Sequence, residues 1–362
     1  MTDPDGTDPD GTDPEGTDPD GTAPRFCYVV LCHRLPDQVT ALVRRIRALS
    51  PTAAVLVRHD RGPAFIDEAA LRRVAGPDVA VLADTRPVTW GDWSMVAATE
   101  LAFVRARELF DPDWCVLVSG QDWPVRDLAA WEVDVAASGA DALVRADPVD
   151  LTWSTGRRIT EDDLFRARWT HRWRLLPPNP LLRRVPAGLR DRVAGRFSAT
   201  LMWYQRPVMV RQLPRRLGWK LGVRRRGNGL PAHWQVRKGE QWIAVDRQAL
   251  AAVDRVTTGD PSVRRFFAGT HIPDESYFQT VLSAAPGVTV ADGRVSWHRF
   301  DRPGAPSAAE LTADDAPAAL ASGAPFARKV EPGPGAAFVA AVDAAIEATA
   351  AAALTAAVGG TR

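Results

Sequence analysis

The chain has 362 residues and a formal net charge of +1. This balance hides two unlike parts, because residues 2–22 repeat a Thr-Asp-Pro-Asp-Gly unit that holds eight of the 44 acidic side chains and no basic one. The remainder carries 45 basic against 36 acidic side chains, a net charge of +9, which favours anionic ligands such as nucleotides or phosphorylated lipids. A chain of this length can form one large α/β domain or two smaller ones.

Composition divides the chain into three parts. Residues 1–24 are acidic, rich in Pro and Gly and almost free of apolar side chains, so we predict a disordered tail; the spacing of a calcium-binding loop is absent. Residues 25–332 have the composition of a folded domain. Residues 333–362 are rich in Ala and Gly, which predicts a tail or an Ala-rich helix.

Two features bear on the compartment. No signal-peptide pattern opens the chain and no uninterrupted apolar run reaches about 18 residues, which predicts a cytoplasmic enzyme that does not span a membrane. Cys27, Cys32 and Cys115 fall in apolar segments without metal-ligand spacing, so we expect buried, reduced thiols.

The first part of the folded domain alternates strand and helix patterns. Apolar runs predict strands at 26–31, 54–57 and 79–82. A helical pattern over 39–49 follows the first of them. This alternation of strands and helices predicts a mostly parallel sheet with helices on its faces. In such sheets, ligands lie beyond the carboxyl ends of the strands. His59, Asp60 and Asp92 occupy such ends.

A further buried strand is predicted over 114–118, and it runs into Ser119-Gly120-Gln121-Asp122-Trp123-Pro124. A carboxylate held between Gly and Pro just past a central strand indicates a ligand contact at Asp122. A turn-forming Asp is the alternative.

Residues 165–230 differ from both flanking segments, because they are rich in Arg and Trp and are broken by prolines. We interpret this region as an acceptor-binding or membrane-surface insert, with structural cover as the alternative. Arginine interleaved with tryptophan is also typical of nucleic-acid surfaces. No nucleic-acid-binding motif is present, so we predict no nucleic-acid partner.

Two adjacent acids, Asp274 and Glu275, follow Pro273 at a predicted helix start. Pro fixes φ for a first turn, and acids suit the positive end of a helix. The spacing to Phe278 and Leu282 puts Glu275 on the apolar side of that helix, so we expect its carboxylate to face the interior or a cleft. Decoration of a helix end is the alternative for both acids.

Six segments form a recognisable set: the opening strand with His33, Trp90-Gly91, Ser119–Pro124, Gly239-Glu240-Gln241-Trp242, Pro273–Thr280 and Phe326-Ala327-Arg328-Lys329. In order and spacing they resemble the family of core-2/I-branching β-1,6-N-acetylglucosaminyltransferases and protein O-xylosyltransferases. The resemblance covers roughly residues 28–330 and is weak between 166 and 230. It implies an α/β nucleotide-sugar transferase (GT-A-like) fold with a Rossmann-like, mostly parallel central sheet. The absence of the animal enzymes' anchor and disulfides favours a bacterial member.

The resemblance also implies the chemistry. Enzymes of this family transfer a sugar from a UDP-sugar with inversion, which needs one base to take the proton of the attacking acceptor hydroxyl. The family's base falls on Glu275, with Asp274 as its substitute. The side chains that bind the donor diphosphate fall on Arg294 and Lys329. A longer loop leaves Arg299 or Arg302 as alternatives to Arg294.

A metal is not expected. Many enzymes of this fold hold a divalent metal through an Asp-x-Asp motif. The only such triplet in the folded part, Asp111-Pro112-Asp113, precedes its strand, and Asp122 stands alone at the strand end. We therefore predict that the enzyme needs no metal and no other cofactor.

The complete prediction is a metal-independent, inverting glycosyltransferase with Asp60 and Asp122 near the nucleotide. Trp90 and Trp242 are expected in acceptor or secondary roles, together with Asp274. The donor is a UDP-sugar, with N-acetylglucosamine favoured and xylose as the alternative. The acceptor is a hydroxyl of a glycan, glycolipid or protein, with peripheral membrane contact through the Arg/Trp-rich insert. A catalytically silent glycan- or nucleotide-binding protein of the same fold is the alternative function.

Overall fold

The computed structural model describes residues 23–84, 86–151, 165, 167–173, 208–212, 219–225, 230, 233–302 and 307–359. Nearly all of the predicted acidic tail lies outside the described residues. So does most of the Arg/Trp-rich insert, and its predicted membrane contact stays a prediction.

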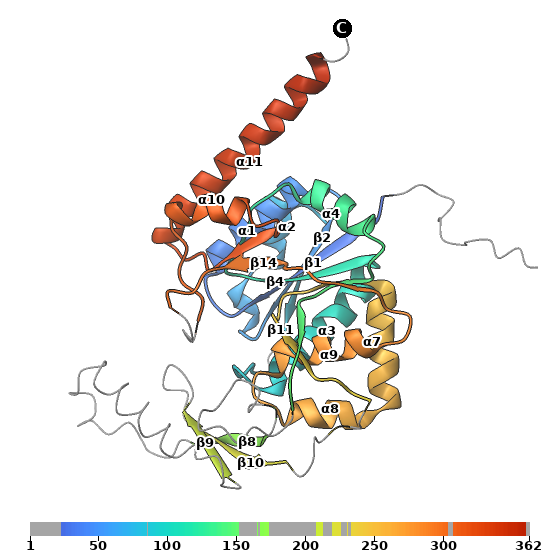
Figure 1. The fold of residues 1–362 in the computed structure, drawn as a ribbon. Helices are drawn as coiled ribbons and strands as arrows, with labels where there is room; N and C mark the ends of the chain where they lie inside the picture. The colour runs from blue at the N-terminus through green and yellow to red at the C-terminus, as the bar shows by residue number, and fades with distance from the viewer. Residues whose placement is uncertain are drawn as a thin grey trace, which may run out of the picture.

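A seven-stranded sheet forms the centre of the fold, in the order β13-β6-β12-β4-β1-β2-β3 (Figure 1). Its strands are β1 (Phe26–Cys32), β2 (Ala54–His59), β3 (Val79–Ala83), β4 (Trp114–Ser119), β6 (Ala142–Leu143), β12 (Ala244–Asp246) and β13 (Val290–Ala291). Neighbouring strands pair in parallel except at β12, which is antiparallel to both β4 and β6. The predicted α/β class with a mostly parallel central sheet is confirmed.

Helices cover the sheet on both sides (Figure 1). One group consists of α1 (Pro36–Leu49), α2 (Glu68–Ala75) and α4 (Leu128–Ala136), and the other of α3 (Trp93–Phe110), α7 (Arg247–Gly259), α8 (Pro261–Ala268) and α9 (Tyr277–Ala284). Shorter turns are η1 (Pro63–Phe65), η4 (Pro273–Glu275), η5 (Ala313–Asp315) and α10 (Ala316–Leu320). The predicted first helix buries Val39, Leu42, Val43 and Ile46 at helical spacing against a sheet whose strands β2 and β4 are buried throughout.

Three smaller sheets complete the fold. One joins β5 (Asp122–Pro124), β15 (Phe326–Arg328) and β14 (Ser296–His298), and another pairs β7 (Ala146–Pro148) with β11 (Arg237–Gly239). The third, from the Arg/Trp-rich insert, contains β8 (Ala167–Trp173), β10 (Trp219–Arg224) and β9 (Val208–Gln212). The first of these sheets brings the segments around residues 122, 297 and 328 next to one another.

The predicted helix start at Pro273 is wrong in one respect. Pro273–Glu275 form a separate 3-10 turn, and Ser276 has φ −147°, which is not helical, so α9 begins only at Tyr277. Glu275 is therefore not part of the helix that carries Phe278. Its direction is set by the turn and not by the apolar stripe.

The C-terminal segment forms one long helix, α11 (Pro334–Gly359), as the Ala-rich composition predicts. Its segment 334–352 is long and apolar enough to cross a membrane by length and composition, with mean hydropathy 1.4, although two acids interrupt it. The expectation that the chain does not span a membrane therefore stays a prediction. Buried helices of soluble proteins meet the same criterion, and Phe338, Val342 and Ile346 are buried against the body.

The cysteine prediction is confirmed. Cys27, Cys32 and Cys115 are free and buried in β1 and β4. Burial raises the pKa of Cys32 and of Cys115 to about 12, so both thiols are protonated and unreactive at neutral pH.

Candidate active site

The carboxyl ends of β1, β2 and β4 meet at one edge of the sheet, with Cys32 opposite His59 in the register. Gly120 follows β4 there and donates its backbone N–H to the Leu31 carbonyl at 2.9 Å. A Cβ on residue 120 would lie 2.8 Å from Cβ of Cys32 and 2.9 Å from Cγ2 of Val39. Only glycine fits this close approach, which explains its place in the predicted Ser-Gly-Gln-Asp segment.

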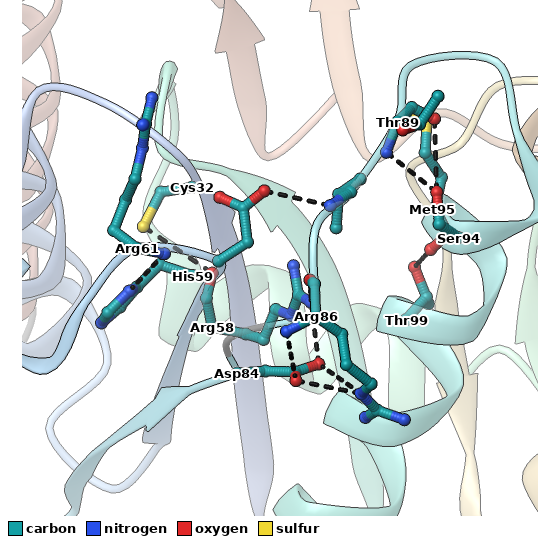
Figure 2. Close-up of polar contacts among 12 residues, drawn as sticks. Cys32, Arg58, His59, Arg61, Asp84, Arg86, Thr89, Ser94, Met95 and Thr99 are labelled. Carbon is teal, nitrogen blue, oxygen red and sulfur yellow. Dashed lines mark hydrogen bonds and ion pairs between the residues drawn. The ribbon is translucent and has the colours of Figure 1, made fainter. Parts of the chain in front are cut away.

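Asp60 lies at the end of β2, as predicted, and its Oδ2 accepts a hydrogen bond from the backbone N–H of Val88 at 3.1 Å. His59 is buried next to it, with its ring 5.0 Å from that of Phe65. Nδ1 of His59 accepts from the Arg61 N–H at 3.2 Å, which leaves the proton on Nε2 (Figure 2). Burial lowers the pKa of His59, so the imidazole is neutral at physiological pH.

A salt bridge joins the end of β2 to the residue that follows β3. Asp84 pairs with Arg58 at 2.9 Å and with Arg86 at 3.0 Å (Figure 2). Burial alone would raise the pKa of Asp84, but the hydrogen bonds from Arg86 and Arg58 outweigh it and lower the pKa to about 2. Asp84 is therefore a fixed anion that holds the chain after β3.

Glu275 lies at the end of turn η4, and its side chain is 37% exposed. Nζ of Lys238, on β11, lies 3.8 Å from its Oε2. Asp274 is only 5% exposed and is buried in the same turn. Of the two adjacent acids, Glu275 is thus the one that a ligand can reach, as the sequence argument requires of a base.

The turn that carries Glu275 is held by the Trp90-Gly91 segment. Ile272 has a left-handed φ of 57° and donates its N–H to the Gly91 carbonyl at 3.1 Å. The buried ring of His271 contacts Trp90 and Trp169, with a centroid separation of 5.7 Å in each case. Trp90 therefore supports the Glu275 turn, and its predicted contact with an acceptor stays a prediction.

A buried ion pair lies under the site. Nε of Arg328 is 3.1 Å from Oδ1 of Asp122, whose Oδ2 accepts from the Ser119 N–H at 2.8 Å. The guanidinium of Arg328 also lies 4.2 Å from the ring centroid of Trp242. Burial raises the pKa of Asp122 to about 6, against the opposing effect of Arg328. Burial likewise lowers the pKa of Arg328, although an arginine this close to a carboxylate stays charged.

Burial bears on two sequence predictions. Asp122 is 0% exposed and anchors Arg328, which argues against the predicted nucleotide contact. Trp242 is 7% exposed and has Arg328 on its ring, which fits a secondary, supporting role, and its predicted acceptor contact stays a prediction.

The two predicted diphosphate ligands have acidic or hydroxyl partners of their own. Nε of Arg294 lies 3.0 Å from Oε1 of Glu240, and Nζ of Lys329 donates to Oγ of Ser307 at 2.7 Å. Burial raises the pKa of Glu240, with Arg294 as its main opposing charge. Arg294 remains 40% exposed and so can reach a ligand.

Of the two alternatives to Arg294, Arg302 stays untested and Arg299 fits less well. Arg299 forms ion pairs with Asp315 at 2.7 Å and Asp301 at 2.9 Å, which use its guanidinium within the protein. Arg294 is therefore the better of the two assignments for a diphosphate ligand.

Sequence reasoning missed Lys238, Glu240 and Arg328. Glu240 and Arg328 belong to segments that the resemblance singled out, so their inclusion there was the available signal. Within the described ranges no group of three His, Cys, Asp or Glu side chains is arranged to hold a metal ion. The predicted independence of metal stays a prediction.

In open α/β sheets, ligands bind beyond the carboxyl ends of the strands, and Asp60 lies at such an end. The model of the Core-2/I-Branching enzyme family matches residues 206–315, a segment that contains Glu240, Glu275 and Arg294. The match covers less than half of the chain, and this segment is thus similar to the core-2/I-branching glycosyltransferases. Lys329, Asp60 and Asp122 lie outside the matched segment.

Solved structures also show similarities. A cytidylyltransferase from Leptospira borgpetersenii is 14% identical with a TM-score of 0.24, over 34% of this chain and 54% of that one. A candidate glucose-1-phosphate thymidylyltransferase from Bacillus anthracis, in complex with sucrose, is 10% identical with a TM-score of 0.31, over 74% and 87%. The chain thus spans about half the length of the first protein. No curated protein matches the chain.

Proposed function

We propose that the protein is an inverting glycosyltransferase that moves a sugar from a UDP-sugar to an acceptor hydroxyl, with Glu275 as base and no resident metal. N-acetylglucosamine is the favoured donor sugar and xylose the alternative. One observation carries the proposal: Glu275 lies within the family-matched segment, on a turn bonded to the loop after β3. Its carboxylate is partly exposed and lies beside Lys238.

In this reaction Glu275 takes the proton of the acceptor hydroxyl while that oxygen forms a bond to the anomeric carbon. The bond between this carbon and the UDP oxygen breaks, and its electron pair leaves with UDP. Negative charge therefore grows on the diphosphate, where fixed positive charge is most useful. Arg294 and Lys329 supply that charge, and their contacts with Glu240 and Ser307 keep both side chains in place before the donor binds.

The nucleotide half of the donor fits the edge formed by β1 and β2. Asp60 has one carboxylate oxygen bound to Val88, and its second oxygen can accept a hydroxyl or an imino N–H. Ligands of open parallel sheets bind at such strand ends. This position supports Asp60 as a nucleotide contact and leaves Asp122 with the structural role.

Replacement of Glu275 by Gln tests the base. We expect Glu275→Gln to reduce UDP release from a UDP-sugar with an acceptor array by at least about 10³-fold, because an amide cannot accept the proton. UDP affinity should stay within about two-fold, measured by calorimetry. The matched control is Glu108→Gln, an exposed glutamate on α3, which should keep parental turnover.

Two results would contradict the proposal. Parental turnover in Glu275→Gln would remove Glu275 as base, and UDP-sugar binding without UDP release for any acceptor would favour the silent binding protein.

A chelator series tests separately whether the enzyme needs a metal. We expect UDP release to be the same with and without EDTA, and restoration by added Mg²⁺ or Mn²⁺ would show a metal-dependent enzyme.

A further inference from the structure

Two arginines meet at Gly269, between the end of α8 and the Glu275 turn. Arg168 comes from β8 and Arg225 follows β10, both in the Arg/Trp-rich insert. The position that a Cβ of residue 269 would take is 3.5 Å from Nη2 of Arg225 and 3.7 Å from Nε of Arg168. The absence of a side chain at Gly269 thus lets two guanidinium groups approach one point.

Neither arginine has an acidic partner in the part of the chain that the structure describes. Nη2 of Arg225 donates to the Phe266 carbonyl at 2.8 Å, and its guanidinium lies 4.1 Å from the Phe266 ring centroid. Nε of Arg225 is buried and makes no hydrogen bond within the described residues. A buried donor without an acceptor is costly, so the contacts within the described residues do not satisfy this guanidinium.

The C-terminal end of α8 balances only part of the positive charge of Arg168 and Arg225. Arg225 lies at the C-terminal end of α8, where the helix dipole carries about half a negative charge. That partial charge cannot balance two full positive charges. Burial and the nearby Arg168 lower the pKa of Arg225 to about 10, as expected for a cation without a counter-ion.

The pair lies close to the proposed base. Glu275 follows Gly269 by six residues, so the two are separated by at most about 20 Å even if the chain were extended. The backbone N–H of Trp169 donates to the Gly269 carbonyl at 2.8 Å, and the same Trp169 contacts His271 on the Glu275 turn. The strand that carries Arg168 therefore contacts the segment that leads into the Glu275 turn.

We propose that Arg168 and Arg225 bind a carboxylate or phosphate group on the acceptor saccharide, so that the acceptor is an acidic glycan. The planar guanidinium fork matches both anions and binds them through paired, charge-assisted hydrogen bonds. Arg225, which is partly exposed, and Arg168, which is exposed, can supply donors to the same group. This inference rests on the proposed function, because it assumes that Glu275 acts on a sugar hydroxyl.

Three matched probes test the site: methyl β-D-glucoside, methyl β-D-glucuronide and methyl β-D-glucoside 6-phosphate. We expect the two charged probes to bind the full chain about ten-fold or more tightly than the neutral one, measured by saturation-transfer NMR at fixed ionic strength. Which charged probe binds more tightly identifies the anion. Arg168→Ala, an exposed position, should reduce the preference without lowering Tm, and the double variant with Arg225→Gln should abolish it.

The control is Arg255→Ala, an exposed arginine on α7, which should keep the preference. Equal affinity for all three probes would overturn the inference, as would a preference that survives in a folded double variant. Binding of these probes needs no turnover. The two hypotheses can therefore fail separately. If Glu275→Gln keeps parental turnover, the proposed base is wrong, but the preference for charged probes can still be measured. If that preference is absent, the inference is wrong, but sugar transfer to neutral acceptors can still be measured.

Discussion

Lys238 and Glu275 form the ion pair nearest to the proposed reaction. Both side chains are partly exposed, at 24% and 37%, so solvent screens their attraction. At 3.8 Å, charges in such surroundings attract by about 1 kcal/mol in water and a few kcal/mol in a drier site. Binding of a donor would expel water and strengthen the pair, so Lys238 can fix the direction of the carboxylate when the reaction occurs.

Replacement of Lys238 tests this positioning role. We expect Lys238→Met to lower kcat about ten-fold with little change in KM for the donor, because the carboxylate loses the group that orients it. Lys238→Arg should restore most of the rate, since it keeps the positive charge. A fall in donor affinity without a fall in kcat would instead make Lys238 a donor-binding residue.

The sequence supports residue-scale predictions unequally. Glu275 and Lys329 can be proposed from the sequence because they lie in compact motifs, and their assigned roles stay predictions. Asp122 is misleading because its burial depends on Arg328, which lies far along the chain and reaches Asp122 only when β15 pairs with β5. Lys238 has no local signal at all, because β11 and turn η4 approach each other only in the fold.

At the scale of elements, the Glu275 turn depends on a contact with the loop after β3. Gly91 has a left-handed φ of 69°, and a Cβ there would lie 3.1 Å from Cε1 of His271. Its carbonyl accepts the Ile272 N–H, which fixes the residue just before Pro273. Gly91 of the Trp-Gly pair is therefore needed because the loop after β3 packs closely against the segment before Pro273.

Gly91→Ala should displace the turn. We expect kcat to fall at least about ten-fold with UDP affinity retained, because a small shift of a base is costly to the reaction. Gly139→Ala is a matched control, since Gly139 has the same φ of 69° and no atom within 4 Å of the Cβ position. Both variants bear the strain of a left-handed alanine, about 1–2 kcal/mol. Equal activity losses in the two variants would refute the His271 contact.

Long elements follow from the sequence better than short ones. The alternation of apolar runs and helical patterns predicts β1, α1, β2, β3 and β4, because each buries a regular face. The antiparallel β12 and the two- or three-residue strands carry too few residues for a periodic signal. The break at Ser276 is the conformation of a single residue, which no pattern of apolar spacing reports.

At the scale of the whole molecule, α11 has two unlike halves. In the first half Phe338, Val342 and Ile346 are buried, and Asp343 accepts a hydrogen bond from Nε1 of Trp123 at 3.0 Å and pairs with Arg45 at 3.0 Å. Beyond Ile346, every side chain that the structure describes is exposed, and the helix extends away from the body (Figure 1). The same segment cannot pack on the body and cross a bilayer at once.

Two truncations separate the halves. A chain that ends at Glu347 should keep the parental Tm and UDP affinity, because every side chain that the structure describes beyond Glu347 is exposed. A chain that ends at Gly333 should lose several kcal/mol of stability, since burial of each large apolar side chain contributes about 1.5–3 kcal/mol.

Liposome flotation tests the alternative that α11 inserts into a membrane. The ion pair of Asp343 with Arg45 leads us to expect that the full chain does not float, and flotation of the full chain but not of the Glu347 truncation would make α11 a membrane anchor.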